Sequence, residues 1–267
     1  MRRLLLTVAG TKCPFGCSYC FALFKDYAAP AALEVAENTP ELLRNIDVLY
    51  PACDVDLFAL PDALAILWRT ARLGRSVSVS TKARLSRRVL RELPSIVGFL
   101  RERNCILKIG VSFSTKHRIP EIEPGTAAYN VRIENLRRLR DAGVSSAVVL
   151  KPILAELPVD EYVELVEDTS ALCGVYLLGD RYLDPSVSDA AGATTVERRL
   201  RVVGWVQGRP TWPVEVATAH LSAIKRAIEN KGLQFFESDL DLMKNLEVER
   251  QLGHGDLLAI QHIVRSI

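Results

Sequence analysis

The spacing of three cysteines near the start of the chain constrains the fold more than any other feature. Cys13, Cys17 and Cys20 are separated by three and then two residues, on a stretch that Pro14 and Gly16 mark as a loop. Thiolates are soft ligands that select zinc or an iron–sulfur cluster, and a closed zinc site needs a fourth protein ligand that is not evident nearby. Three cysteines on a four-iron cubane leave one iron open, unlike the four-cysteine sites of ferredoxins. The loop therefore predicts a [4Fe–4S] cluster with an open iron. A zinc knuckle or three cysteines packed in the core are the alternatives.

Short apolar runs and helical segments alternate along the first two thirds of the chain. This pattern predicts parallel βα units with right-handed crossovers, and so an α/β fold. The cysteine loop directly follows the first run, at the carboxyl end of a strand, where α/β folds bind their ligands. Strands are expected at residues 4–9, 46–52, 76–80, 106–114, 146–150 and 174–178, and helices at 38–45, 61–73, 133–142 and 160–172, with one more from residue 86 that breaks near Pro94.

The alternation is lost beyond residue 179. A helix is expected at 214–230, a strand at 233–236 and a helix at 240–251. The chain is therefore predicted to divide into a barrel of residues 1–184 and a C-terminal extension, or lid, of residues 185–267 packed on it. The basic N-terminus leads straight into the cysteine loop, which does not fit a signal peptide. Six cysteines, three in the loop and the others scattered among apolar segments, indicate a cytoplasmic protein with no membrane partner.

The cysteine loop resembles the signature of the radical SAM superfamily, because Tyr19 precedes its last cysteine and Phe21 follows it. The resemblance implies a partial (β/α)6 barrel, here with a short mixed C-terminal extension. It also implies that the open iron of the [4Fe–4S] cluster binds S-adenosyl-L-methionine. In the family, an electron from the cluster cleaves this cofactor to a 5′-deoxyadenosyl radical, which abstracts hydrogen from a substrate. An external one-electron reductant of the flavodoxin or ferredoxin type is implied as a partner.

Within the superfamily, residues 8–155 are similar to the spore photoproduct lyase group. The resemblance rests on the cysteine loop, Ala-Cys-Asp-Val-Asp at 52–56, Ser-Thr-Lys at 80–82, Val-Ser-Phe-Ser at 111–114, and Glu-Pro-Gly-Thr at 123–126 with an arginine six residues later. It does not extend beyond about residue 185. Relatives that share cofactor machinery need not share a substrate, because function lies in the site carried by the fold.

The resemblance assigns cofactor contacts to five side chains around the cysteine loop. Asp54 and Asp56 occupy the region that presents a carboxylate to the methionine amino group, a charge-assisted contact. Lys82 and Arg132 are linked to the methionine carboxylate, and Tyr19 adjoins the cluster. Each has an ordinary alternative: a helix cap for either aspartate, and a solvated surface position for either cation.

Two serines and one cysteine complete the candidate site. Ser112 and Ser114 are two residues apart on a strand and share a face, so they are candidates for the ribose hydroxyls. Cys53 resembles the cysteine that returns a hydrogen atom to the product radical in spore photoproduct lyase, and is the candidate catalytic residue. A small buried hydrophobe is the alternative for Cys53. The strand at 175–179 is expected beneath the adenine. Asp180, Tyr182 and Asp184 are expected near the substrate.

The charge pattern leaves the substrate open. A net charge of +2 is too small to indicate a nucleic-acid binder. However, the stretch from Ala63 to Arg91 contains eight arginines and lysines and no acid. A second basic cluster, Arg198, Arg199 and Arg201, lies near Trp205 and Trp212 in the sequence. A nucleobase in nucleic acid is thus one candidate substrate. A maturase of a small metabolite, nucleoside or peptide is another. An iron–sulfur sensor or electron-transfer protein is the alternative outside enzymes.

Overall fold

Six parallel strands form the core of the computed structural model, which describes residues 1–8, 13–20, 31–154, 156–179, 205–206, 209–210 and 214–250. All six predicted strands are present, in the predicted order. They are β1 (Arg3–Thr7), β3 (Val48–Tyr50), β4 (Ser76–Thr81), β5 (Leu107–Ser112), β6 (Ser145–Leu150) and β7 (Val175–Leu178).

Two short strands extend this sheet at its edges. β2 (Ala31–Ala32) pairs with β1, and β10 (Gln234–Phe236) pairs with β7, so the order is β10-β7-β6-β5-β4-β3-β1-β2 with every pairing parallel. β8 (Trp205–Val206) and β9 (Arg209–Pro210) form a separate antiparallel pair. The architecture confirms the predicted partial (β/α)6 barrel.

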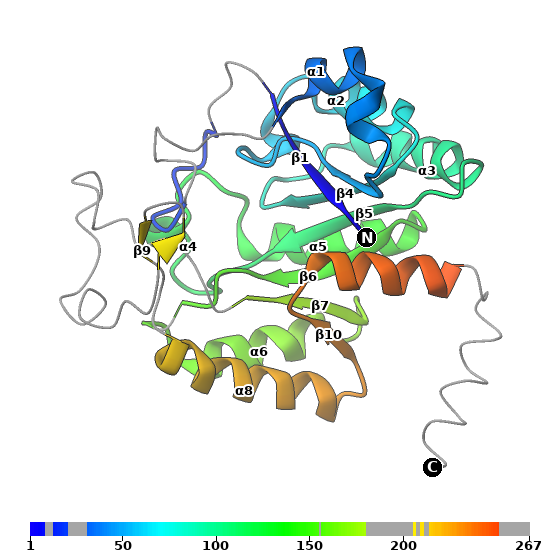
Figure 1. Ribbon diagram of the computed structural model, residues 1–267. Helices are drawn as coiled ribbons and strands as arrows, with labels where there is room; N and C mark the ends of the chain where they lie inside the picture. The colour runs from blue at the N-terminus through cyan, green and yellow to red at the C-terminus, as the bar shows by residue number, and fades with distance from the viewer. Residues whose placement is uncertain are drawn as a thin grey trace.

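Helices cover the convex side of the curved sheet (Figure 1). Their apolar faces explain this position: α2 (Ala63–Arg72), for example, buries Ile66 and Leu67 completely or almost so. The remaining crossover helices are α3 (Arg87–Arg101), α5 (Tyr129–Asp141) and α6 (Val159–Thr169), and α8 (Val214–Asn230) packs on α6. Shorter turns of helix are α1 (Leu33–Asn38), η2 (Pro40–Leu43), η3 (Leu57–Ala59) and α4 (Ile119–Ile122).

Two helix predictions were wrong in detail. α3 runs without a break through Pro94, whose ring is exposed. Burial of Val89, Leu93, Ile96 and Leu100 along one face outweighs the roughly 3 kcal/mol that an interior proline costs. The helix expected at 38–45 is instead the end of α1 followed by the 3₁₀ turn η2, and no side chain caps either element.

A helix of residues 239–250 lies on the concave side of the sheet, between β1 and β10 (orange in Figure 1). Its apolar residues pack against inward-facing strand residues in one cluster, whose buried members are Val48, Ile106, Ala147, Val149, Leu177, Leu242, Met243 and Leu246. The helix was predicted, but not its place inside the half-barrel. The domain boundary predicted at residue 184 lies outside the described residues and stays a prediction, although β10 from the second segment joins the main sheet.

No helix in the described part of the chain has the length and apolar character needed to cross a membrane.

Candidate functional site

The cysteine loop lies against the loop that carries Glu-Pro-Gly-Thr. The backbone N–H of Ser18 donates to the carbonyl of Ile122 at 2.9 Å. Gly125 adopts a φ of +81°, and a Cβ placed on it would lie 3.2 Å from the carbonyl oxygen of Pro14. Two features therefore favour glycine at position 125: the left-handed backbone conformation and the close approach of the two loops.

Cys17 is the buried cysteine of the loop. Burial is the main reason that the pKa of the Cys17 thiol is raised to about 12. The Lys82 cation acts to lower this pKa, and smaller contributions that raise it come from Glu123, Cys20 and Cys13. Within the described residues, no three acidic, histidine or cysteine side chains converge on the position of a single metal ion. In a cubane each thiolate ligates a different iron, so three neighbouring thiols on one loop fit the cluster without meeting at a point. Metal binding would replace the proton that burial holds on the Cys17 thiol.

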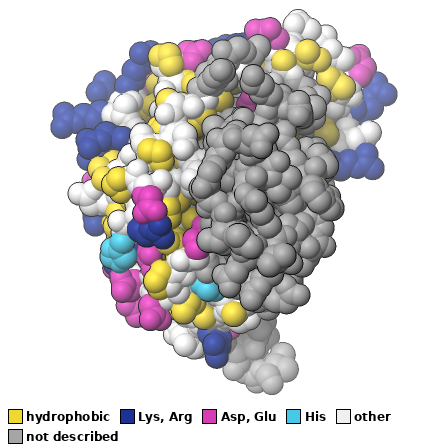
Figure 2. All heavy atoms as spheres, turned by 90° about the vertical axis from the view of Figure 1, so that its left-hand side faces the viewer, with side chains coloured by type: hydrophobic (Ala, Val, Ile, Leu, Met, Phe, Trp, Pro, Cys, Tyr) yellow, Lys and Arg dark blue, Asp and Glu magenta, His cyan; other side chains and the backbone are white. Residues whose placement is uncertain are grey.

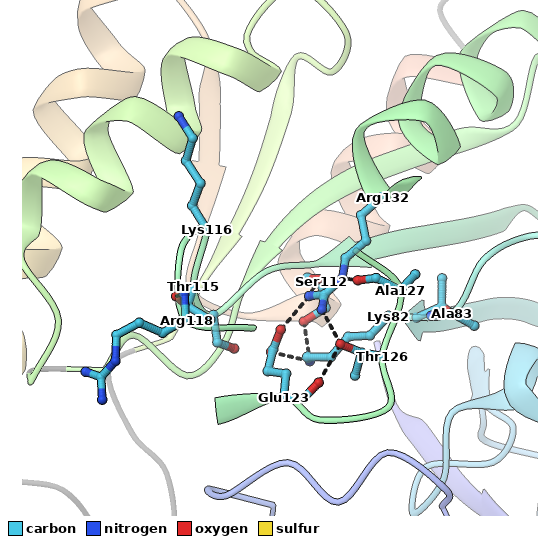
Figure 3. A network of polar contacts seen from close by, with 12 residues as sticks. Lys82, Ala83, Ser112, Thr115, Lys116, Arg118, Glu123, Thr126, Ala127 and Arg132 are labelled. Carbon is cyan, nitrogen blue, oxygen red and sulfur yellow. Dashed lines mark hydrogen bonds and ion pairs between the residues drawn. The ribbon is translucent and has the colours of Figure 1, made fainter. Parts of the chain in front are cut away.

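Glu123 is the centre of a buried polar network above β5 (Figure 3). Its carboxylate accepts a hydrogen bond from Arg132 Nη1 at 2.5 Å, and both side chains are completely buried. The Arg132 guanidinium also donates to the carbonyl oxygens of Ser112, at 3.0 Å, and Ala127, at 2.8 Å, and to the Thr126 hydroxyl. All three of its nitrogens thus bind protein acceptors, and Arg132 joins α5 to β5.

Lys82 and Tyr19 meet the other oxygen of the same carboxylate. Lys82 Nζ lies 3.7 Å from Glu123 Oε1 and donates to Ser112 Oγ at 2.7 Å (Figure 3). The Tyr19 hydroxyl donates to Glu123 and accepts a hydrogen bond from Ser114 Oγ at 2.7 Å. The Lys82 ammonium also lies 5.7 Å from the centre of the Tyr19 ring. Five predicted cofactor residues, Tyr19, Lys82, Ser112, Ser114 and Arg132, are therefore brought together around Glu123.

The two aspartates differ in what they bind. Asp56 caps η3 by accepting from the backbone N–H of Phe58 at 3.1 Å, and accepts from the backbone N–H of Lys82 at 2.6 Å and from the Thr81 hydroxyl at 2.8 Å. Burial nevertheless raises the pKa of Asp56. Asp54 has a buried carboxylate oxygen with no hydrogen-bond partner in the described part of the chain, and burial raises its pKa too. Asp56 therefore positions Lys82, while Asp54 keeps an acceptor available for a ligand.

Cys53 lies in the turn after β3, at the same edge of the sheet. Its backbone N–H donates to the carbonyl of Leu6 in β1 at 3.0 Å, and its side chain is half-buried. The preceding residue, Ala52, has a φ of 54°, a left-handed conformation that costs an alanine about 1–2 kcal/mol. Strain of this kind clusters at functional sites. Cys105 and Cys173 are buried in the core, as expected.

Sequence reasoning missed two buried glutamates. Glu123 belongs to the Glu-Pro-Gly-Thr motif, but the motif alone did not reveal it as the shared partner of two cations and a phenol. Glu161 of α6 accepts from the Thr115 hydroxyl and the Lys116 N–H, both at 2.5 Å, and so holds the loop that follows β5. No local pattern signals that role. Several predicted residues lie outside the described part of the chain: Asp180, Tyr182, Asp184, Arg198, Arg199, Arg201 and Trp212.

Comparisons with known proteins bear on the fold. No protein-family model matches the sequence, and no curated protein matches it. Among solved structures, spore photoproduct lyase complexed with dinucleoside spore photoproduct is similar with a TM-score of 0.63 at 16% identity, over 84% of this chain and 74% of the lyase chain. A lyase variant with bound AdoMet and the same ligand gives 0.64 at 15%, over 87% and 81%.

A third similar structure is SuiB of Streptococcus suis bound to precursor peptide SuiA. Its TM-score is 0.57 at 10% identity, over 89% of this chain and 49% of SuiB. Both proteins are radical SAM enzymes, and at these identities the likeness concerns the fold. The chain thus has the radical SAM partial-barrel fold, as its cysteine loop predicted.

Proposed function

We propose that this chain is a radical S-adenosylmethionine enzyme of the spore photoproduct lyase type. The observation that carries the proposal is the convergence of the cysteine loop, Lys82 and buried Glu123 at the carboxyl ends of parallel strands. When bound, the [4Fe–4S] cluster and S-adenosylmethionine supply a 5′-deoxyadenosyl radical that abstracts hydrogen from an unactivated C–H bond. The protein's residues position the cofactor and substrate and exclude water.

Within this proposal, the geometry favours Lys82 over Arg132 as the cation for the methionine carboxylate. The donors of Arg132 are directed at protein acceptors, whereas the Lys82 ammonium has one hydrogen bond, to Ser112, and a longer contact with Glu123. Arg132 then acts as a positioning residue. Asp54, with its unpartnered oxygen, is the aspartate that suits the amino group. Ser112, Ser114 and Tyr19 line the same network.

Cys53 is the proposed hydrogen-atom donor. Its S–H bond would break as the product C–H bond forms, and a later return of hydrogen to the sulfur would make the cycle redox-neutral. The Cys53→Ala variant is expected to stall or divert the substrate radical. A wild-type product distribution in that variant would remove Cys53 from the mechanism.

Formation of 5′-deoxyadenosine tests the proposal as a whole. Reconstituted and reduced protein, incubated anaerobically with S-adenosylmethionine, should release it, and Cys13→Ala should not. Cys105→Ala is the matched control, because Cys105 lies in the core outside the cysteine loop. If wild type makes no more than Cys13→Ala although it holds a cluster, the sensor or electron-carrier alternative applies. If it holds zinc, the radical proposal fails.

A nucleic-acid substrate is supported by one feature of the described surface. Arg84 precedes α3, and Arg87, Arg88 and Arg91 lie in its first two turns. All four are exposed and make no ion pair with the described part of the chain. Figure 2 views the side on which α4 lies and shows Lys and Arg side chains at its upper left. Such a cluster suits phosphate groups.

The salt dependence of oligonucleotide binding tests this surface. Removing two phosphate contacts with Arg87→Gln plus Arg88→Gln should reduce the slope of log K against log salt by about 1.8 for duplex DNA. Arg137→Gln plus Arg138→Gln is the matched control, since both of these arginines already pair with Glu134. Undetectable or salt-independent binding would favour the small metabolite, nucleoside or peptide as substrate, and SuiB bound to a peptide illustrates the last of these.

An external reductant and a reducing location complete the proposal. The cluster needs one electron to start the reaction, and a flavodoxin or ferredoxin type of partner would supply it. Cluster thiolates persist best where glutathione and thioredoxin keep thiols reduced, so a cytoplasmic location is proposed.

A further inference from the structure

Lys151 directly follows β6 and faces the concave side of the sheet. Val149, two residues earlier, belongs to the interior cluster that packs on the helix of residues 239–250. Residues two apart on a strand share a face. The Lys151 side chain also extends across Gly179 at the end of β7: a Cβ on Gly179 would lie 2.5 Å from Lys151 Cγ and 2.6 Å from its Cε. Lys151 was not singled out by the sequence.

The ammonium of Lys151 has a neutral partner only. Its Nζ donates to the backbone carbonyl of Glu237 at 2.6 Å, and no carboxylate of the described residues lies within ion-pair distance. Burial lowers the pKa of Lys151. The carboxylates of Asp239 and Glu237 act to raise that pKa, whereas the cations of Lys108 and Arg3 lower it further. A half-buried ammonium with no carboxylate of the described residues in ion-pair distance can accept an anion.

The carboxylates whose charges act on Lys151 have other partners. Among the described residues these are Asp239 and Glu237. Asp239 is already bound to Lys108 at 2.7 Å, and Glu237 pairs with Lys225. Both carboxylates thus have a closer cation than Lys151.

Water reaches the interior face near the carboxyl ends of the strands. Ser80 is exposed although it lies on β4, a central strand. Its hydroxyl lies on the interior side, because a Cβ on Gly110 would come within 3.0 Å of Ser80 Oγ and 2.5 Å of Val149 Cγ2. The interior face is thus open to solvent at Ser80, near the carboxyl end of β4.

We propose that Lys151 binds an oxyanion of the substrate, either a phosphate monoester or a carboxylate, in the mouth of the half-barrel. This rests on the proposed function, since it concerns the substrate of the same site. Two N–H bonds of the ammonium remain for the ligand after the Glu237 carbonyl takes one. Lys151 selects substrates by charge and holds the anionic end apart from the reacting C–H bond.

Inorganic phosphate and acetate are the probes, added to the full-length protein and assayed without radical chemistry. Thermal unfolding gives their affinities, because a ligand that binds only the native state raises Tm. Acetylation of Lys151 by acetic anhydride, read by mass spectrometry, reports on the site itself. Phosphate or acetate should protect Lys151, and which of the two protects better identifies the kind of oxyanion.

Anion binding by three variants tests the role of Lys151 further. Lys151→Met should weaken binding of the preferred anion about tenfold or more, the effect of one lost charged hydrogen bond. Gly179→Ala should weaken it similarly, because the new Cβ displaces the flexible lysine chain while every charge stays. Lys244→Met, which removes an exposed lysine from the helix of residues 239–250, should bind the anion as wild type does.

Three results would overturn the inference. One is equal anion affinity in wild type and Lys151→Met. Another is acetylation of Lys151 unaffected by either anion. The third is weaker S-adenosylmethionine binding in Lys151→Met with anion binding retained, which would assign the lysine to the cofactor. None of these requires or excludes 5′-deoxyadenosine formation, so failure here is distinct from failure of the proposed function.

Discussion

At the scale of single residues, Glu123 shows how one carboxylate orders a whole site. It contacts Arg132 from α5, Lys82 from the end of β4 and Tyr19 from the cysteine loop. Its two oxygens accept hydrogen bonds from Arg132 and Tyr19, and the Lys82 ammonium lies 3.7 Å away. The orientation of Lys82 and Tyr19 therefore depends on a residue that need not touch a ligand.

Replacing Glu123 tests this dependence. Glu123→Gln leaves the Arg132 guanidinium buried without a counter-charge, and breaking such a buried pair typically costs about 3–5 kcal/mol. Urea unfolding should show a loss of this size. Glu134→Gln is the control, because Glu134 pairs with Arg137 and Arg138 at the surface, and it should unfold close to wild type. Equal losses in the two variants would contradict the assigned role of the network.

At the scale of elements, the site depends on the close packing of two loops. Gly125 permits the Glu-Pro-Gly-Thr loop to contact the backbone of Pro14 and Phe15. The position of the cysteines is thereby linked to that of Glu123, two residues before Gly125 and far from the cysteines in sequence.

Gly125→Ala and Gly143→Ala separate loop packing from backbone strain. Both glycines have positive φ, +81° and +65°, so each alanine should destabilise the fold by about 1–2 kcal/mol. Only at Gly125 would the new Cβ meet another loop; at Gly143 it meets nothing within 4 Å. Iron content after anaerobic reconstitution should therefore fall for Gly125→Ala alone. Comparable iron in both variants would show that the packing does not hold the cysteines.

The proline inside α3 offers a second prediction for a single element. Pro94 lacks the N–H that would bond to the preceding turn, and its exposed ring gains little from packing. Pro94→Ala should raise the free energy of unfolding by up to about 3 kcal/mol, measured by urea titration. The neighbouring exposed Ser95→Ala should change it by less than about 1 kcal/mol. A destabilised Pro94→Ala would mean that the ring has a packing role.

Prediction from sequence succeeded where local pattern decides structure and failed where distant contacts decide it. The six core strands and the cysteine loop follow from periodicity and spacing. α3 was expected to break at Pro94, because proline disfavours a helix interior. It continues, because burial of Leu93 and Ile96 stabilises the helix by more than the proline destabilises it. Glu161 and Lys151 were missed because their roles arise from other elements: the loop after β5 for Glu161, and Gly179 and Glu237 for Lys151.

At the scale of the whole molecule, a buried ion pair fastens the last described helix to the centre of the sheet. Lys108 of β5 is fully buried and lies 2.7 Å from Asp239, which also accepts from Ser78 Oγ at 2.8 Å. Burial acts to raise the pKa of Asp239, but the charge and hydrogen bond of Lys108, with the hydrogen bond from Ser78, outweigh it and lower the pKa.

The pH dependence of stability should reveal this pair. Because the pKa of Asp239 is lower in the folded than in the unfolded chain, its contribution is present above the unfolded value near 3.9 and is lost as pH falls through the folded value. Asp239→Asn should therefore be far less stable than wild type at neutral pH, and the gap should narrow below about pH 4. The exposed Asp241→Asn is the control. A gap independent of pH, measured by urea unfolding, would contradict the ion pair.

The same helix sets an order of events during synthesis. Ser76 binds Glu247, 171 residues later in the chain, and Lys108 binds Asp239, 131 residues later. The strands can leave the ribosome and pair while their concave surface still faces solvent or a chaperone, and such long-range contacts form slowly. The cysteine loop is translated well before the helix of residues 239–250, and the half-barrel behind the loop is filled only when that helix emerges. A ligand of the loop would therefore meet its final surroundings only after that helix has been made.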